Sequence, residues 1–424
     1  MERKQIAPAA YLCRIGAEKF NQCRVALHFQ YPARRDRATA DALLPLVLER
    51  GFADCPDMTE LSRRLARLYG ADLTVETAMN GANRVLTVSV TGLKDELALE
   101  GEALSRQYAA LALGVAFHPY LVGDTFDPEA VEIEKDKLKK QLEAQVNNKR
   151  SYCVRQARRR YFGSSPAGIE RDGYPEEVEG ITPAALTQAY REMLRAATID
   201  LMAVGADGDM LAELLAGELA GLDRQPLALA PASAMPRQEP ALFEENMEME
   251  QAKLCLLFTA GRPTGTEEMA ACRLAMSLFG GSATSRLFLN VREKQSLCYY
   301  CGATYSSVTG TMSVDSGIQP QNAARAEAAI LKELKDLCEG PITQEELEDC
   351  RRGLLSGLGS VEDTLSGLEN WYYTEICRDG AVDSPAQARA ALEAVTADQV
   401  RQVLRMFSLS VRYLLTPKEA QEDA

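Results

Sequence analysis

The stretch SATSRLFLNVREKQSLCYYCGATY spans residues 282–305, and the prediction of the fold starts from it. Its first residues are small and hydroxylated, as at the capped start of a helix. Apolar residues one turn apart then predict a short helix, and the alternation after it predicts a strand. One side of a regular strand would carry Tyr299, Cys301, Ala303 and Tyr305. Arg292 and Tyr299 lie on either side of this helix-to-strand corner, so a cation and a phenol can converge on one site there.

A proline-rich stretch divides the chain. Residues 222–240 contain four prolines and show neither a helical nor a strand period, which predicts an extended linker. After it an earlier pattern begins again, because the strand expected at 24–29 recurs 229 positions later and two helical segments recur at offsets of 216 and 214. The ordered repetition predicts a duplication. We therefore expect an α+β fold with two homologous domains, each a mostly antiparallel sheet packed with helices, at residues 1–221 and 243–424, joined by a linker at 222–242.

The rest of the chain supplies the other expected elements. The patterns predict strands at 23–31 and 199–204, a hairpin over 73–90 that turns at Asn80-Gly81, helices at 38–50, 59–69 and 93–114, one continuous helix from 128 to 160, and a helix that begins at Thr182-Pro183. The basic cluster within residues 149–160 is interpreted as a solvated helix face rather than as a contact with a substrate or partner.

Composition limits the classes of function. The net charge of −14 argues against a nucleic-acid binder, which needs a basic surface. The first residues lack the apolar core of a signal peptide, and the apolar segment 108–117 is too short to span a bilayer, so we expect a cytoplasmic protein with no membrane contact. The 11 cysteines are expected to be reduced. Cys298 and Cys301 are expected on opposite sides of a regular strand, as packing residues.

The stretch around Arg292 resembles a known family. An Arg followed seven positions later by a Tyr, after SRLF and a Gly/Ser-rich turn, is similar to the carboxy-terminal half of the insulinase/pitrilysin-type zinc metallopeptidases. The resemblance covers nearly the whole chain and implies the paired-domain architecture. It implies that Arg292 and Tyr299 hold the substrate backbone and stabilise the tetrahedral intermediate, with Tyr300 as a neighbouring substrate-binding residue.

Family members with a zinc site carry H-x-x-E-H on the first long helix and a glutamate on a later helix, which together bind the ion and activate its water. Here the corresponding helix reads ADALLPLVLERG, and the motif positions hold Ala42, Pro45 and Leu46. Glu134 matches a family carboxylate, but Gln141 stands where the ligand is expected. The two histidines, at 28 and 118, are interpreted as a packed and a surface residue. We expect no metal or other cofactor in this chain.

These features favour a non-catalytic, half-length subunit that pairs with a zinc-bearing peptidase subunit of the same family. It would supply substrate-binding residues in trans and half of a chamber for a peptide or protein substrate. The resemblance also implies a bacterial protein associated with the modification of elongation factor P. One alternative is a peptide-binding or scaffold protein with no peptidase role, and another is an autonomous peptidase with an unfamiliar metal site. Pairing of the isolated chain with itself stays open.

Overall fold

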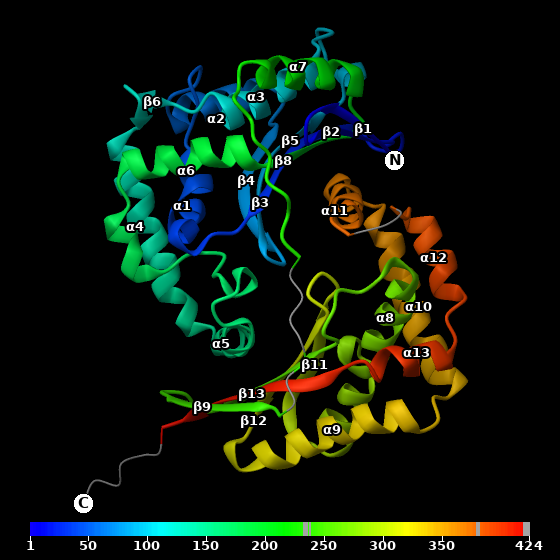
Figure 1. The fold of residues 1–424 in the computed structure, drawn as a ribbon. Coiled ribbons are helices and arrows are strands. Elements are labelled where there is room, and N and C mark those ends of the chain that lie inside the picture. Colours follow the sequence, from blue (N-terminus) through cyan, green and yellow to red (C-terminus); the bar gives the residue numbers. More distant parts are fainter. Residues whose placement is uncertain (232–235, 237–238, 379–381, 419–424) are drawn as a thin grey trace, which may run out of the picture. The chain divides into compact units, whose positions relative to one another are not determined.

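The computed structural model describes residues 1–231, 236, 239–378 and 382–418 (Figure 1). They form two compact units that interleave in sequence. Unit 1 contains residues 1–144, 165–231 and 362–373, and unit 2 contains the described residues of 145–164, 232–361 and 374–424. Each unit joins one main β-sheet to several helices, so the α+β class is confirmed. In this described part of the chain, every helix is too short or too polar to cross a membrane.

The sheet of unit 1 has six strands in the order β1-β2-β8-β3-β5-β4. Its strands are β1 (Glu2–Ala7), β2 (Ala10–Ile15), β3 (Gln22–Pro32), β4 (Asp72–Asn80), β5 (Asn83–Leu93) and β8 (Thr198–Val204). A small ribbon joins β6 (Leu121–Val122) to β7 (Thr125–Phe126). The helices are α1 (Ala38–Leu48), α2 (Met58–Arg67), α3 (Leu104–Phe117), α4 (Pro128–Ala144), α6 (Pro183–Ala196), α7 (Gly208–Ala220) and most of α11 (Leu365–Ile376). The pair β2–β8 is parallel and the other neighbouring pairs are antiparallel.

The two faces of this sheet differ in polarity. On β3, Val25, Leu27 and Phe29 belong to the apolar core, which also takes residues from α1, α3, α6 and α7. Arg24 and His28 alternate with them and therefore lie on the other face. Both contact Glu369 of α11, so that helix covers the polar face.

Unit 2 repeats this arrangement with five strands in the order β11-β12-β10-β13-β9. Its strands are β9 (Ala241–Met247), β10 (Ala252–Thr259), β11 (Cys298–Ser306), β12 (Thr311–Ile318) and β13 (Ser408–Pro417). Its helices are α5 (Lys149–Phe162), α8 (Met269–Met276), α9 (Ala323–Glu339), α10 (Gln344–Val361), α12 (Pro385–Glu393) and α13 (Ala397–Leu404), and the π-helical turns are η7 (Ser277–Gly281) and η8 (Leu287–Lys294). Helix α5 packs on β10 and β13.

The strand orders support the duplication. Read from the opposite edge, β9-β13-β10-β12-β11 follows the same path as β2-β8-β3-β5-β4. In both five-strand paths the first pair is parallel (β9–β13 and β2–β8), and the remaining pairs are antiparallel, while unit 1 adds β1 beyond β2. The central strands β10 and β3 are the two segments whose sequences repeat. A sequence repeat and a matching topology both follow from two copies of one fold.

Two predicted helices were wrong in extent. The helix expected at 93–114 begins only at Leu104, because β5 continues to Leu93 and Asp95 accepts hydrogen bonds from the backbone and hydroxyl of Ser105. The helix expected from 128 to 160 ends at Ala144 and restarts at Lys149, where the side chain of Asn148 accepts from the Ser151 backbone at 3.0 Å. Polar side chains that cap helices therefore override a continuous helical pattern.

The basic cluster on α5 is also more than a solvated face. Its arginines are largely on the accessible side, but Cys153 and Ala157 are buried. Tyr161 donates to Thr259 at 2.8 Å. Helix α5 is thus the helix that covers one face of the unit 2 sheet. Of the expected linker, residues 232–235 and 237–238 lie outside the described residues, and the described residues from 223 to 231 form neither helix nor strand.

Candidate functional site

The corner that carries Arg292 and Tyr299 belongs to unit 2. The chain turns at η7, forms η8, passes Ser296 in a left-handed conformation (φ 50°) and enters β11. The Ser285 hydroxyl accepts from the Phe288 backbone at 3.4 Å, as a capping side chain does. A Cβ on Gly280 would lie 2.8 Å from the Ala303 backbone nitrogen, so only glycine lets η7 approach β11 this closely.

Arg292 and Tyr299 are both accessible at this corner. The Arg292 side chain is 39% exposed, lies 3.4 Å from the Glu293 carboxylate and places its guanidinium 4.6 Å from the centre of the Phe288 ring. Tyr299 is 50% exposed, and its hydroxyl accepts from Gln319 at 3.5 Å. The two side chains lie at the same corner without a direct hydrogen bond to each other among the described interactions. Both keep exposed surface that can contact a ligand, and their substrate-binding role stays a prediction.

Tyr300 faces a different environment from Tyr299. The Arg150 guanidinium lies 4.3 Å and the Lys253 ammonium 5.5 Å from the centre of the Tyr300 ring. Its hydroxyl is buried with no hydrogen-bond partner in the described residues, and burial raises the pKa of the phenol above its ordinary value, so it stays protonated. Tyr300 therefore lies under the start of α5, and its predicted contact with substrate stays untested.

The helix that would carry the zinc motif is α1. Ala42 and Pro45 are buried, and Leu46 packs against the apolar core of unit 1. Gln141 on α4 is exposed. An alkyl side chain, a proline ring and an aliphatic side chain offer no metal ligand, so the residues at these positions do not fit a zinc ion. Among the residues that the structure describes, no three His, Cys, Asp or Glu side chains are grouped to hold a metal.

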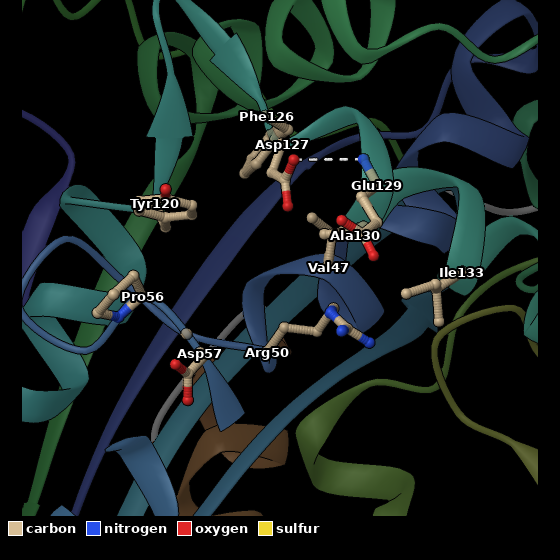
Figure 2. A pocket seen from close by; sticks show the side chains of 11 residues that line it. Val47, Arg50, Pro56, Asp57, Tyr120, Phe126, Asp127, Glu129, Ala130 and Ile133 are labelled. Carbon is tan, nitrogen blue, oxygen red and sulfur yellow. Dashed lines mark hydrogen bonds between the residues drawn. The ribbon is translucent and has the colours of Figure 1, made fainter. Parts of the chain in front are cut away.

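The other candidate ligands have protein partners. His28 lies 3.0 Å from the Thr87 hydroxyl through Nδ1 and 2.8 Å from Glu369 through Nε2. His118 is exposed and lies 2.7 Å from Glu218. Glu134 pairs with Arg50 at 2.9 Å. This pair lies beside a cavity of about 220 Å³ between the end of α1 and the starts of α2 and α4, which Arg50, Asp57, Tyr120, Asp127 and Glu129 help to line (Figure 2). His28, His118 and Glu134 are thus each paired with neighbouring protein side chains.

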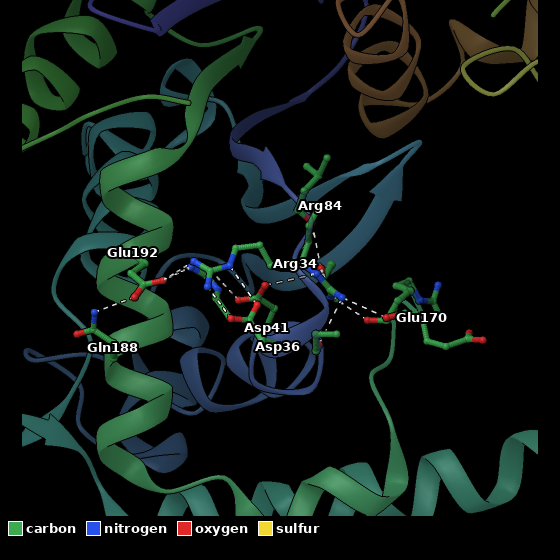
Figure 3. Close-up of polar contacts among 12 residues, drawn as sticks. Arg34, Asp36, Asp41, Arg84, Glu170, Gln188 and Glu192 are labelled. Atoms are coloured by element: carbon green, nitrogen blue, oxygen red, sulfur yellow. Dashed lines mark hydrogen bonds and ion pairs between the residues drawn. The ribbon is translucent and has the colours of Figure 1, made fainter. Parts of the chain in front are cut away.

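A buried ionic network occupies the start of α1, and sequence reasoning missed it (Figure 3). Arg84 on β5 is 1% exposed and donates to the backbone carbonyls of Arg171 at 2.8 Å and Glu170 at 3.3 Å. It also lies 3.9 Å from Asp41, which pairs with Arg37 at 2.9 Å. Burial raises the pKa of Asp41, against the opposing charges of Arg37 and Arg84. The sequence feature that could have indicated this network is Arg84 itself, a charged residue directly before the apolar run of a hairpin strand.

Comparisons with known proteins agree with this geometry. Residues 180–354 match the family model described as "Peptidase M16 inactive domain". The "Probable inactive metalloprotease YmfF" of Bacillus subtilis (strain 168) is 24% identical, over 96% of this chain and 95% of that protein. An uncharacterized zinc protease of Mycobacterium bovis is 26% identical over 67% of the chain and 66% of its own length.

Solved structures share the fold. A conserved protein from Enterococcus faecalis V583 superimposes with a TM-score of 0.91 at 23% identity and 99% coverage of both chains. A peptidase M16 inactive domain from Pseudomonas fluorescens gives a TM-score of 0.73 at 18% identity, with 97% of both chains covered.

The chain is thus a homologue of the M16 metallopeptidases, the insulinase/pitrilysin type that its sequence predicted, and the family model matches residues 180–354. Its likeness is to the members described as inactive, and it is similar over nearly its whole length to YmfF.

Proposed function

We propose that this chain is the zinc-less subunit of a two-chain M16 peptidase. The partner, a zinc-bearing subunit of the same family, supplies the metal and the general base. This chain supplies Arg292 and Tyr299 to the partner's active site, together with one wall of the chamber that holds the substrate peptide. The association with the modification of elongation factor P belongs to the same proposal and rests on the family resemblance.

One contrast carries this proposal. The accessible Arg292 and Tyr299 lie at an ordered corner of unit 2, whereas the helix α1 offers only Ala42, Pro45 and Leu46 at the metal positions. An exposed guanidinium can donate to a peptide carbonyl, and a phenol can donate to a developing oxyanion. Neither group can generate a hydrolytic water on its own, so cleavage needs a second chain that binds the ion.

The test is reconstitution. The purified chain is mixed with the zinc-bearing M16 subunit of the same bacterium, and cleavage of a fluorogenic peptide is measured for each chain alone and for the mixture. We expect activity only in the mixture, and Tyr299→Phe should lower kcat about 100-fold, as the loss of one oxyanion donor does. Arg292→Met should lower kcat/KM.

Two control variants keep the result specific. Tyr305→Phe removes a hydroxyl from the same strand, but the Tyr305 ring packs edge-on against Phe407 at 5.8 Å. Arg352→Met removes an arginine whose side chain is 75% exposed on α10. Both should leave the mixture active. Full activity of the Tyr299 and Arg292 variants would reject the role in trans. A mixture that binds peptide without cleaving it would support the alternative of a peptide-binding protein.

A further inference from the structure

The strand β11 contains an irregularity that changes the relation of its two cysteines. Cys298 pairs with Ile318 on β12, but Tyr300 pairs with Gly317, so Tyr299 is one extra residue on the β11 side. Such a β-bulge interrupts the alternation of side chains. Cys301 then pairs with Ser316, two residues from Ile318, so both thiols lie on the same face. The prediction that they point to opposite sides was therefore wrong, because it assumed a regular strand.

The register brings the two thiols to neighbouring positions on one face, and each shifts the pKa of the other. The Ser316 hydroxyl, opposite Cys301, donates to the Tyr300 carbonyl at 2.9 Å. Cys298 is partly accessible, whereas Cys301 is buried. One thiol can thus meet a reagent from solution while the other lies beside it, which is the arrangement of an attacking and a resolving cysteine.

The surroundings favour a thiolate at Cys298. The pairing with Cys301 and the positive charge of Arg292 outweigh partial burial and lower the pKa of Cys298 to about 7. The same pairing raises the pKa of Cys301, as does its burial. The contrast with Cys338, another partly accessible cysteine, is clear, since burial raises the pKa of that thiol. Reaction with a disulfide proceeds through the thiolate, so Cys298 is the thiol prepared to attack.

The backbone around this pair has room to move. β11 is an edge strand, bound only to β12 within its sheet. The bulge at Tyr299 leaves one residue outside the ladder of hydrogen bonds. A disulfide needs Cα atoms within about 7 Å, which a strand can reach for this spacing only by tightening such a bulge. A central strand would resist that change, whereas an edge strand with a bulge permits it.

We propose that Cys298 and Cys301 form a reversible dithiol–disulfide modification site whose oxidant is a low-molecular-weight disulfide. The Cys298 thiolate attacks one sulfur of the oxidant, breaks its S–S bond and releases one small thiol, which takes up a proton. The Cys301 thiol, losing its proton, then attacks Cys298 sulfur and releases the second small thiol. Two protein thiols become one disulfide, and one small disulfide becomes two thiols, so atoms and electrons balance.

Oxidation would act directly on Tyr299, because that residue is the bulge the disulfide tightens. It would also remove the thiolate that lies near Arg292. The effect on peptide binding rests on the proposed function, in which Tyr299 and Arg292 contact the substrate. On that basis, the oxidised chain holds peptides more weakly than the reduced chain. The modification itself does not depend on that function.

The modification is tested by mass spectrometry on the full chain. Trypsin releases residues 295–325 as one peptide, which contains Cys298 and Cys301 and no other cysteine. After incubation with oxidised glutathione and alkylation of the remaining thiols, we expect this peptide to have lost two hydrogen atoms and to resist alkylation. Dithiothreitol should restore both alkylation sites. In the reduced chain at pH 7, Cys298 should alkylate about ten times faster than Cys338.

Variants separate the two roles. Cys301→Ser should trap the glutathione adduct on Cys298, and Cys298→Ser should leave Cys301 as a free thiol. Cys338→Ser is the control and should form the disulfide as the wild type does. A persistent glutathione adduct on the wild-type peptide, or alkylation of Cys298 no faster than that of Cys338, would overturn the proposal. Binding of a labelled peptide to the reduced and oxidised chain then tests the coupling to Tyr299 alone, and equal affinities would overturn that step while leaving the modification standing.

Discussion

In each unit a helix packs on one face of the sheet through an ion pair, and the two helices carry opposite charges in these pairs. In unit 1 the strand residues Arg24 and His28 meet the acid Glu369 on α11. In unit 2 the strand carries the acid, Asp315, and Arg150 on α5 is the base, with one N–O distance of 3.2 Å. Both sheets thus bind a covering helix through an ion pair, but on strands that are not equivalent, because Arg24 and His28 lie on β3 whereas Asp315 lies on β12, the counterpart of β5.

The second difference is burial. The side chains of Glu369 and His28 are 2% and 4% exposed, and that of Arg24 is 12% exposed. In unit 2, Asp315 is 7% exposed but Arg150 is 54% exposed. A buried charge that loses its partner cannot return to water, whereas an accessible one can. The helix-to-sheet contact in unit 1 should therefore depend far more on the Glu369 carboxylate than the contact in unit 2 depends on that of Asp315.

The largest effect is expected for Glu369→Gln. The change removes the negative charge between Arg24 and His28 and should lower the free energy of unfolding by about 3 kcal/mol, the range for a broken buried pair. Urea denaturation followed by circular dichroism measures the loss, and hydrogen exchange should show faster exchange in α11 than in α5. A loss below about 0.5 kcal/mol, as at a surface site, would contradict the burial argument.

Titration of the same carboxylate should produce a smaller effect. Burial acts to raise the pKa of Glu369, but the hydrogen bond and charge of His28 and the charge of Arg24 outweigh it and lower the pKa below its ordinary value of 4.5. A carboxylate with a lowered folded pKa stabilises the protein fully above the unfolded pKa, and this contribution is lost as the pH falls through the folded value.

A second acid on that face acts in the opposite direction. Asp200, beside His28, has its pKa raised by burial, against the charge of Arg3. Its contribution to stability therefore grows as the pH falls. The difference between wild type and Glu369→Gln isolates one carboxylate from the other. We expect this difference in the free energy of unfolding to shrink as the pH is lowered below 4.5. A difference that is constant with pH would show that Glu369 is not the titrating group.

The unit 2 contact should respond less to the matched change. Asp315→Asn keeps one hydrogen-bond acceptor for Arg150 and releases a guanidinium that is already half in water, so we expect a loss of about 1 kcal/mol. The same urea titration and hydrogen exchange apply, now with α5 as the region that should exchange faster. A loss as large as that of Glu369→Gln would mean that accessibility of one partner does not weaken the pair.

The sequence was informative where a pattern is local. The repeat of residues 24–29 at 253–258 predicted two copies of one domain, and β3 and β10 are indeed the central strands. The hairpin turn at Asn80-Gly81 follows from the left-handed conformation of Gly81 (φ 63°), which glycine favours. The absence of ligands at Ala42, Pro45 and Leu46 was equally readable, because it depends only on residue type.

The sequence was less informative where distant segments meet. Nothing local shows that α5 packs on the sheet that begins some 90 residues later, or that Glu369 reaches His28, 341 positions away in the chain. Arg84 was missed for the same reason, since its main partners lie at residues 170 and 171. The bulge at Tyr299 has no compositional mark at all. The bulge is defined by the pairing of β11 with β12, and it determines which face of the sheet both cysteines occupy.

The smallest effect is expected from Asp363→Asn, in the segment that also carries Glu369. Asp363 pairs with Lys19 at 3.4 Å, but the two side chains are 70% and 52% exposed. Water solvates both charges before and after the change, so the loss should stay within about 0.5 kcal/mol. The charge removed is the same as in Glu369→Gln, and the two residues are six positions apart. If urea denaturation gave equal losses for both variants, the helix would be held by net charge rather than by the buried pair, and burial would no longer distinguish the two units.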